Sequence, residues 1–165
     1  MRATTLLNTV LGIKFAIVKG VEFTDTGLVC DVEPTTTIAR CGGCFRPVSQ
    51  VHDTRKARHW RHLDLAGMSL TLRYAPRRVN CTRCGVTTEL VPWAEPMSWF
   101  PHAFEQTVGY LAKEASKTVS TMMRVGWSTV GPIVGRVVGR LLPGDQLNGL
   151  THIGVDELSY RKHHK

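Results

Sequence analysis

The sequence has no run of about 18 uncharged apolar residues, the least that a transmembrane helix needs, so no membrane span is expected. Its first residues include an arginine but no long apolar core ahead of a small-residue cleavage site, so no signal peptide is predicted. No βαβ pattern stands beside a cysteine pair, which argues against a thioredoxin-like redox protein.

Acidic residues are scarce between residues 40 and 83. This segment holds ten arginines and lysines against only Asp53 and Asp64, which accounts for the whole net charge of +8. Nine of the ten are arginines, whose planar guanidinium groups match phosphate bidentately, whereas lysine acts as a point charge. A solubilising face is the simpler interpretation, but the arginine bias favours nucleic acid as the acidic partner.

Cysteines are few, and four of the five form two Cys-x-x-Cys pairs. The pairs are Cys41 with Cys44 and Cys81 with Cys84, separated by 36 residues. Four thiolates at about 2.3 Å suit a closed tetrahedral zinc site, so these residues are the predicted metal ligands. The alternatives are two redox dithiols or four unrelated buried cysteines.

Glycines accompany both cysteine pairs where a tight turn is needed. Gly42 and Gly43 lie inside the first pair and Gly85 follows the second, where the backbone folds back towards sulfur and φ can be positive. Reduced cysteines that bind metal suit a cytoplasm better than an oxidising compartment. The fifth cysteine, Cys30, lies in a predicted strand and is expected in the core.

The patterns along the chain predict an α+β protein of several parts. Residues 1–39 are expected to form a helix over 4–13 and a β-hairpin between 15 and 36. Residues 40–90 are expected to form a zinc ribbon that is too small to bury much apolar surface, so the metal must stabilise it. Residues 91–102, rich in proline and aromatic side chains, are an ordered linker.

Residues 103–143 show the order of a helix-turn-helix unit: a helix, a short helix, a glycine turn and a longer helix over 127–142. In such units the N-terminal residues of the last helix meet base edges in the major groove. Here those residues are Ser128 and Thr129, with Ser128 also a plausible N-cap. The alternative is a generic helical bundle.

The arginines near these two residues, Arg124, Arg136 and Arg140, are expected to contact phosphates. The complete set of predicted DNA-contacting residues is Arg55, Arg58, Arg61, Arg77, Arg78, Arg124, Ser128, Thr129 and Arg136.

The other conspicuous side chains have structural interpretations. Since four cysteines fill a tetrahedron, His52, His59 and His62 are expected at phosphates or on the surface rather than on the metal. Trp60 is expected to fill the small core of the ribbon, with stacking on a base as the alternative. Close packing on a neighbouring helix is expected for the glycines that recur every four residues, Gly131, Gly135 and Gly139.

Five motifs occur in a recognisable order. They are ARCGGC at 39–44, RHLDL at 61–65, RRVNCTRC at 77–84, WSTV at 127–130 and IGVDELSYRK at 153–162. In order and spacing the chain resembles the ISL3-type insertion-sequence transposases. The resemblance implies an N-terminal zinc ribbon, a helix-turn-helix, and an RNase-H-like catalytic domain with an Asp-Asp-Glu triad.

By this resemblance, residues 150–165 are the truncated start of the RNase-H-like domain and Asp156 is its first metal-binding acid. The second Asp and the Glu would lie beyond Lys165. Strand transfer with two metal ions needs all three carboxylates. The chain is therefore expected to be an N-terminal part that is inactive by itself, with Mg²⁺ needed only by a full-length catalytic domain.

The expected function is recognition of terminal inverted repeats in double-stranded DNA for transposition, in the bacterial cytoplasm at the nucleoid. A homodimer, or pairing with a full-length transposase, is expected as a further partner. One alternative is a zinc-dependent protein-interaction module or regulator without direct DNA readout. The other is an active nuclease or transferase as the chain stands.

Overall fold

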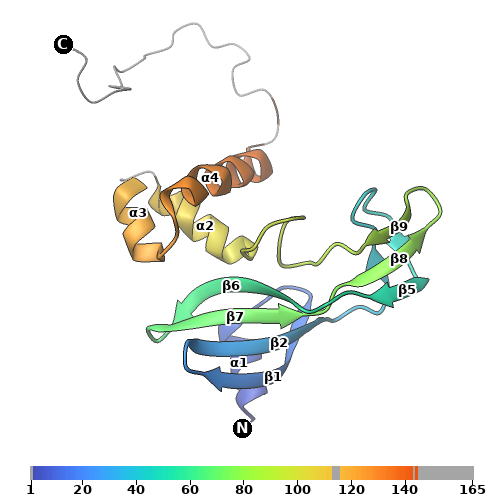
Figure 1. Cartoon of the computed structure of the whole chain (residues 1–165), viewed down its shortest axis with the longest axis horizontal. Helices are drawn as coiled ribbons and strands as arrows, with labels where there is room; N and C mark the ends of the chain where they lie inside the picture. The colour runs from blue at the N-terminus through green and yellow to red at the C-terminus, as the bar shows by residue number, and fades with distance from the viewer. Residues whose placement is uncertain (1, 113–115, 143, 145–165) are drawn as a thin grey trace, which may run out of the picture.

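The computed structural model describes residues 2–112, 116–142 and 144, which form a four-stranded sheet, a ribbon of short strands and a group of three helices (Figure 1). The three helices lie along one edge of the sheet, and the ribbon extends from one end of it. The predicted α+β class is confirmed. The segment predicted to begin an RNase-H-like domain, with Asp156, lies outside the described residues.

The sheet has the order β1-β2-β7-β6 and carries helix α1 (Ala3–Leu11). Strands β1 (Ala16–Thr24) and β2 (Gly27–Pro34) form the predicted hairpin, with Thr24 opposite Gly27 at the turn. Strand β7 (Met68–Tyr74) pairs parallel with β2 and antiparallel with β6 (Arg58–Leu65). The hairpin therefore becomes half of a larger sheet.

Strands β6 and β7 belong to this sheet, whereas the sequence pattern predicts them within the ribbon. Leu70 and Leu72 of β7 and Trp60 of β6 are fully buried with the apolar residues of β2 and α1. Trp60 thus fills the core of the sheet and not that of the ribbon. The pairing of β7 with β2 is parallel and distant in sequence, so no local pattern reveals it.

The segment predicted as a linker also contributes to this core. Val91 and Trp93 are buried, and the Trp93 ring meets Trp60 edge-on at 5.7 Å and Tyr74 at 5.4 Å. His62, expected on the surface, is buried as well, and this burial lowers the pKa of its imidazole. The segment therefore closes the core of the sheet as well as leading to the helices.

The ribbon consists of a two-stranded and a three-stranded sheet. Strand β3 (Ala39–Arg40) pairs with β4 (Pro47–Val48), and β8 (Arg77–Cys81) lies between β5 (Val51–Thr54) and β9 (Gly85–Thr88). None of these strands contributes a side chain to either of the two apolar clusters found in the described residues. Besides its cysteines, the ribbon buries only the small apolar side chains of Ala39 and Val79 among its described strands, too little to hold it together without a metal.

Helices α2 (His102–Leu111), α3 (Ser116–Met123) and α4 (Trp127–Leu141) follow the predicted order, with the turn at Gly126. Gly126 is the N-cap of α4 and no side chain caps it, so the predicted Ser128 cap is wrong. The three helices share a buried apolar core, which consists of Phe104, Val108, Val119, Val130, Ile133 and Val137.

Crossing a membrane requires a length and an apolar character that no helix of the described residues combines.

The glycine repeat of α4 does not mediate helix packing. A Cβ atom added at Gly131, Gly135 or Gly139 would have no atom of the described residues within 4 Å, because these positions lie opposite the buried face of the helix. The close approach occurs instead at Gly109 of α2, where an added Cβ would lie 3.0 Å from Val137 Cγ1. The prediction that the regularly spaced glycines of α4 pack against a neighbouring helix is therefore wrong.

Candidate metal centre and nucleic-acid interface

Four cysteine sulfurs meet where the two sheets of the ribbon join. Cys41 and Cys44 come from the turn between β3 and β4, whereas Cys81 ends β8 and Cys84 lies in the turn between β8 and β9. Their sulfur atoms all lie within 4.8 Å of one another. A tetrahedral site with Zn–S bonds of about 2.3 Å has sulfur–sulfur edges of about 3.8 Å, so this cluster fits zinc.

The two cysteine turns have related backbones. The residue after each pair has a positive φ, 61° at Phe45 and 72° at Gly85, which confirms the positive φ expected at Gly85. The N–H of Phe45 donates to Cys41 O at 2.9 Å, and the N–H of Gly43 points at Cys41 Sγ at 3.4 Å. At Gly43 an added Cβ would lie 3.2 Å from Cys84 Sγ. Glycine is thus needed there for close approach and not for a positive φ.

Gly42 is held against the backbone at the end of β9. Its N–H donates to Thr88 O at 3.1 Å, and an added Cβ would lie only 2.4 Å from that same oxygen. A further bond, from Leu90 N to Arg40 O at 2.8 Å, continues this pairing. The first cysteine turn is therefore fastened to the second hairpin by backbone contacts.

Gly42→Ala is expected to lower the free energy of unfolding by about 2 kcal/mol or more, because the new methyl group meets a backbone oxygen that cannot turn away. Gly139→Ala is the matched control, since its methyl group would enter open space on a helix and should stabilise by about 0.5–1 kcal/mol. Urea unfolding of both variants measures the difference. Equal effects of the two substitutions would contradict the fastened turn.

Cys81 is prepared for deprotonation. The backbone N–H groups of Arg83 and Cys84 point at its sulfur and hold the pKa of the Cys81 thiol down, at about 6. Thiolate is the form that binds metal. Cys30, by contrast, is buried in the core of the sheet as predicted, and burial raises the pKa of its thiol to about 11.

Comparison with known proteins identifies this ribbon. Residues 38–84 match the family described as the zinc-finger of transposase IS204/IS1001/IS1096/IS1165, the ISL3-type zinc ribbon. The chain is also 37% identical, over its whole length, to a transposase for insertion sequence element IS1557 from Mycobacterium tuberculosis strain CDC 1551 / Oshkosh. The chain is thus similar in sequence to an insertion-sequence transposase, and its ribbon to that of the ISL3 type. The resemblance found in the motifs is confirmed, and the four-cysteine cluster supports a structural zinc site.

A second curated relative, the IS1557 transposase of M. tuberculosis strain ATCC 25618 / H37Rv, shows the same 37% identity. The chain spans 39% of the length of these transposases. No solved structure matches the chain. The similarity supports a role related to transposition, and the transposase family suggests DNA binding.

Two arginines predicted to contact DNA from the ribbon are paired with carboxylates of the chain. Arg77 forms an ion pair of 2.6 Å with Glu89, whose side chain is 1% exposed, and Tyr74 donates to the same carboxylate at 2.7 Å. Arg78 pairs with Asp53 on the surface. Arg77 therefore stabilises the base of the ribbon. The exposed guanidinium group of Arg55, by contrast, donates to Thr88 Oγ1 at 3.4 Å and has no carboxylate partner among the described residues.

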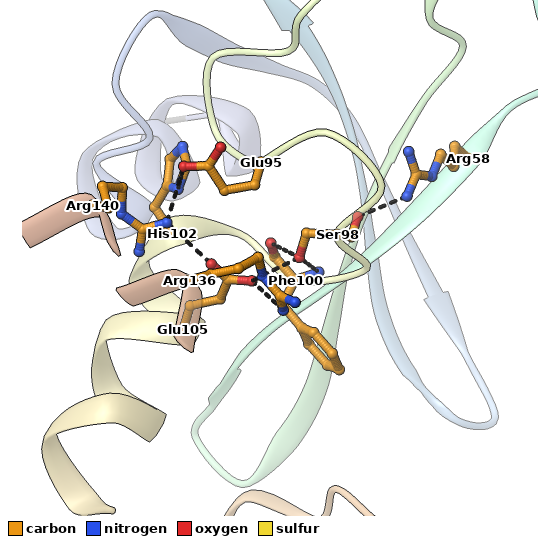
Figure 2. A network of polar contacts seen from close by, with 8 residues as sticks. All are labelled: Arg58, Glu95, Ser98, Phe100, His102, Glu105, Arg136 and Arg140. Carbon is orange, nitrogen blue, oxygen red and sulfur yellow. Dashed lines mark hydrogen bonds and ion pairs between the residues drawn. The ribbon is translucent and has the colours of Figure 1, made fainter. Parts of the chain in front are cut away.

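Arg136 and Arg140 of α4 also turn inward, although phosphate contacts are expected from the sequence. Both bind Glu105 of α2, whose side chain is fully buried, at 2.6 Å and 3.1 Å (Figure 2). Ser98 Oγ donates to the same carboxylate at 2.8 Å. Arg140 also pairs with Glu95 at 3.2 Å. This network joins α2, α4 and the segment before α2, so these arginines have a structural role.

Three other predicted residues come together where the sheet meets the helices. Arg61 of β6, Arg124 of the α3–α4 turn and Thr129 of α4 line a hollow of about 420 Å³, together with His59 and Trp99. We call this site the junction hollow. It lies beside the first turn of α4, where Ser128 is also exposed. There predicted residues from β6 of the sheet and from the helices share a surface.

Asp64 holds the two arginines of the junction hollow in place. It pairs with Arg124 and, at 3.5 Å, with Arg61, whose guanidinium also donates to Arg124 O at 2.9 Å. Arg124 stays 53% exposed and has a φ of 50°. Trp99 was not among the predicted site residues, because a tryptophan between prolines gives no sign of whether its ring faces solvent or core.

Proposed function

We propose that the chain binds double-stranded DNA and recognises the terminal inverted repeats of its insertion sequence. The first turn of α4 would enter the major groove with Ser128 and Thr129, as the last helix of a helix-turn-helix does. The observation that carries this proposal is the meeting of Arg61, Arg124 and Thr129 in the junction hollow beside that turn. There the two guanidinium groups can hold the phosphates that flank the bases being read.

The zinc ribbon would act as a rigid support and as a second backbone contact. Arg55 and Arg78 are the predicted contacts that the ribbon itself offers, with Arg78 sharing its charge with Asp53. Arg58 belongs to β6 of the sheet, where its guanidinium group donates to Ser98 O at 2.7 Å. Cys41, Cys44, Cys81 and Cys84 would bind one structural zinc ion through their thiolates. A homodimer, or pairing with a full-length transposase, would bring two repeats together.

Catalysis is proposed only for a complete transposase. Asp156 would supply one carboxylate of an Asp-Asp-Glu triad that holds Mg²⁺, and the chain by itself would not cut or join DNA. Incubation with Mg²⁺ and DNA that carries the repeat tests this. Cleavage that Asp156→Ala abolishes would overturn the proposed inactivity.

DNA binding is testable by fluorescence anisotropy with a duplex of the terminal repeat at several salt concentrations. Affinity is expected to fall steeply with salt. A plot of the logarithm of the binding constant against the logarithm of the salt concentration should have a slope of about −0.9 for each phosphate contacted. Arg124→Ala should weaken binding and reduce that slope by about 1. Lys19→Ala is the matched control, because Lys19 lies on β1 and pairs with Glu33 at 3.7 Å, away from the hollow. A flat salt dependence, or equal effects of both variants, would contradict the proposal.

A zinc-dependent protein-interaction module is the second candidate, and exposed apolar side chains on the ribbon favour it. Phe45 is 55% exposed and Val86 is 48% exposed. Phe45→Ser with Val86→Ser should leave repeat binding unchanged if the ribbon serves DNA, and should abolish self-association or pairing with the full-length transposase if it serves protein. Size-exclusion chromatography with both proteins separates these outcomes.

A further inference from the structure

Trp99 is an exposed tryptophan on a rigid base. The residue is 62% exposed, yet its backbone O accepts a bond of 3.0 Å from Arg61 N of β6. On either side of it, Ser98 O accepts from Arg58 at 2.7 Å, and Phe100 N donates to Ser98 Oγ at 3.0 Å (Figure 2). Ser98 Oγ in turn donates to the buried Glu105. The ring thus projects from a fixed backbone and needs no ordering on binding.

One face of the Trp99 ring is already occupied by a cation. The guanidinium carbon of Arg58 lies 4.7 Å from the centre of the Trp99 ring and 5.0 Å from that of Trp60. Arg58 therefore fixes the exposed indole against the buried one. Trp99 is also one of the residues that line the junction hollow. A flat aromatic face beside arginines is the arrangement that single-stranded nucleic-acid sites use for stacking bases.

The rest of the hollow suits the other parts of a nucleotide. Its volume of about 420 Å³ lies within the range of small-ligand sites, roughly 300–1,000 Å³. Arg61 and Arg124 supply two guanidinium groups. Asp64 pairs with both, but its single negative charge offsets only one of their two positive charges. Thr129 adds a hydroxyl group on the α4 side. An excess of positive charge around an open aromatic ring favours a polyanion with bases over an acidic protein.

Resting on the proposed function, we propose that the junction hollow binds one unpaired nucleotide of DNA at the point where its strand leaves the duplex, with the base stacked on Trp99 and the phosphate that joins it to the duplex at Arg124. This goes beyond the reading of a duplex by α4, and places a single-stranded contact directly beside the helix that is proposed to enter the groove. Unpaired or displaced bases next to the bound repeat would be captured there. Stacking on Trp99 would be tolerant of base identity, because every base has an aromatic face.

The test uses the zinc-loaded chain and a fluorescein-labelled single strand of 20 thymidines at low salt. Trp99→Ala should weaken binding about 5- to 150-fold, which corresponds to about 1–3 kcal/mol for one stacked base. Trp99→Phe keeps a ring and should bind within about threefold of the wild type. Phe23→Ala is the matched control, because Phe23 is 75% exposed at the tip of the β1–β2 hairpin and lies outside the hollow.

A 20-base-pair duplex of the terminal repeat separates this proposal from the proposed function. Trp99→Ala should bind the duplex as the wild type does, with unchanged zinc content and unfolding midpoint. Wild-type affinity of Trp99→Ala for the single strand would overturn the stacking site, as would failure of the wild type to bind the single strand, and either result leaves duplex recognition standing. An equal loss for single strand and duplex would also overturn it, since Trp99 would then serve general binding.

Discussion

Cys81→Ser is expected to abolish zinc binding and to unfold the ribbon while the sheet and the helices stay folded. The reason is that none of the ribbon strands contributes a side chain to the two apolar clusters of the described residues. Zinc binding in small modules supplies about 10–16 kcal/mol, which such a ribbon cannot replace by burial. Elemental analysis should fall from one zinc per chain to none, and amide exchange should become fast in β3–β5 and β8–β9 only.

Cys30→Ala is the matched control for the loss of a thiol. Cys30 is fully buried in the core of the sheet and lies apart from the four-cysteine cluster. This variant should keep one zinc per chain and lose about 1 kcal/mol of stability, as expected for a small reduction of buried volume. One equivalent of tightly bound zinc in Cys81→Ser would contradict the assignment of the site.

Glu105→Ala is expected to lower the free energy of unfolding by about 3–5 kcal/mol, because it leaves two guanidinium groups without their buried counter-charge. The carboxylate is fully buried and accepts from Arg136, Arg140 and Ser98. Urea unfolding followed by circular dichroism measures the loss. Glu33→Ala is the control: its carboxylate is 58% exposed, pairs with Lys19 at 3.7 Å, and should cost less than about 1 kcal/mol.

The double variant Glu105→Leu with Arg136→Leu distinguishes a missing counter-charge from a missing contact. Replacing both members of a buried pair by apolar groups costs far less than removing one. Arg140 keeps Glu95 as a partner at 3.2 Å in this variant. Its stability should therefore lie closer to the wild type than that of Glu105→Ala. A double variant as unstable as Glu105→Ala would contradict this explanation.

Local patterns in the sequence were sufficient for several parts of the structure. The two Cys-x-x-Cys pairs predict the sulfur cluster, since each pair fixes its own turn and only one distance between the pairs remains to be set. Alternating apolar residues around the Thr24–Gly27 turn predict the hairpin. The glycine at position 126 marks the turn before α4. Each of these features depends on residues close together in the chain.

Pairing over long distances escapes such patterns. Arg136 and Glu105 are 31 residues apart, so nothing in the sequence distinguishes Arg136, which pairs with a buried carboxylate, from the more exposed Arg124. The parallel contact of β7 with β2 is equally remote, and it takes Trp60 and His62 into the core of the sheet. An arginine-rich segment therefore predicts a basic surface only after the carboxylates that bind its members are known.

Methylation interference on the terminal-repeat duplex tests most directly whether α4 reads DNA. Guanine N7 lies in the major groove, where Ser128 and Thr129 would meet base edges. We predict that N7 methylation at a few adjacent guanines blocks binding of the wild-type chain, and that Thr129→Ala loses this effect at one of them. Binding that no N7 methylation disturbs, or an identical pattern in Thr129→Ala, would contradict the account.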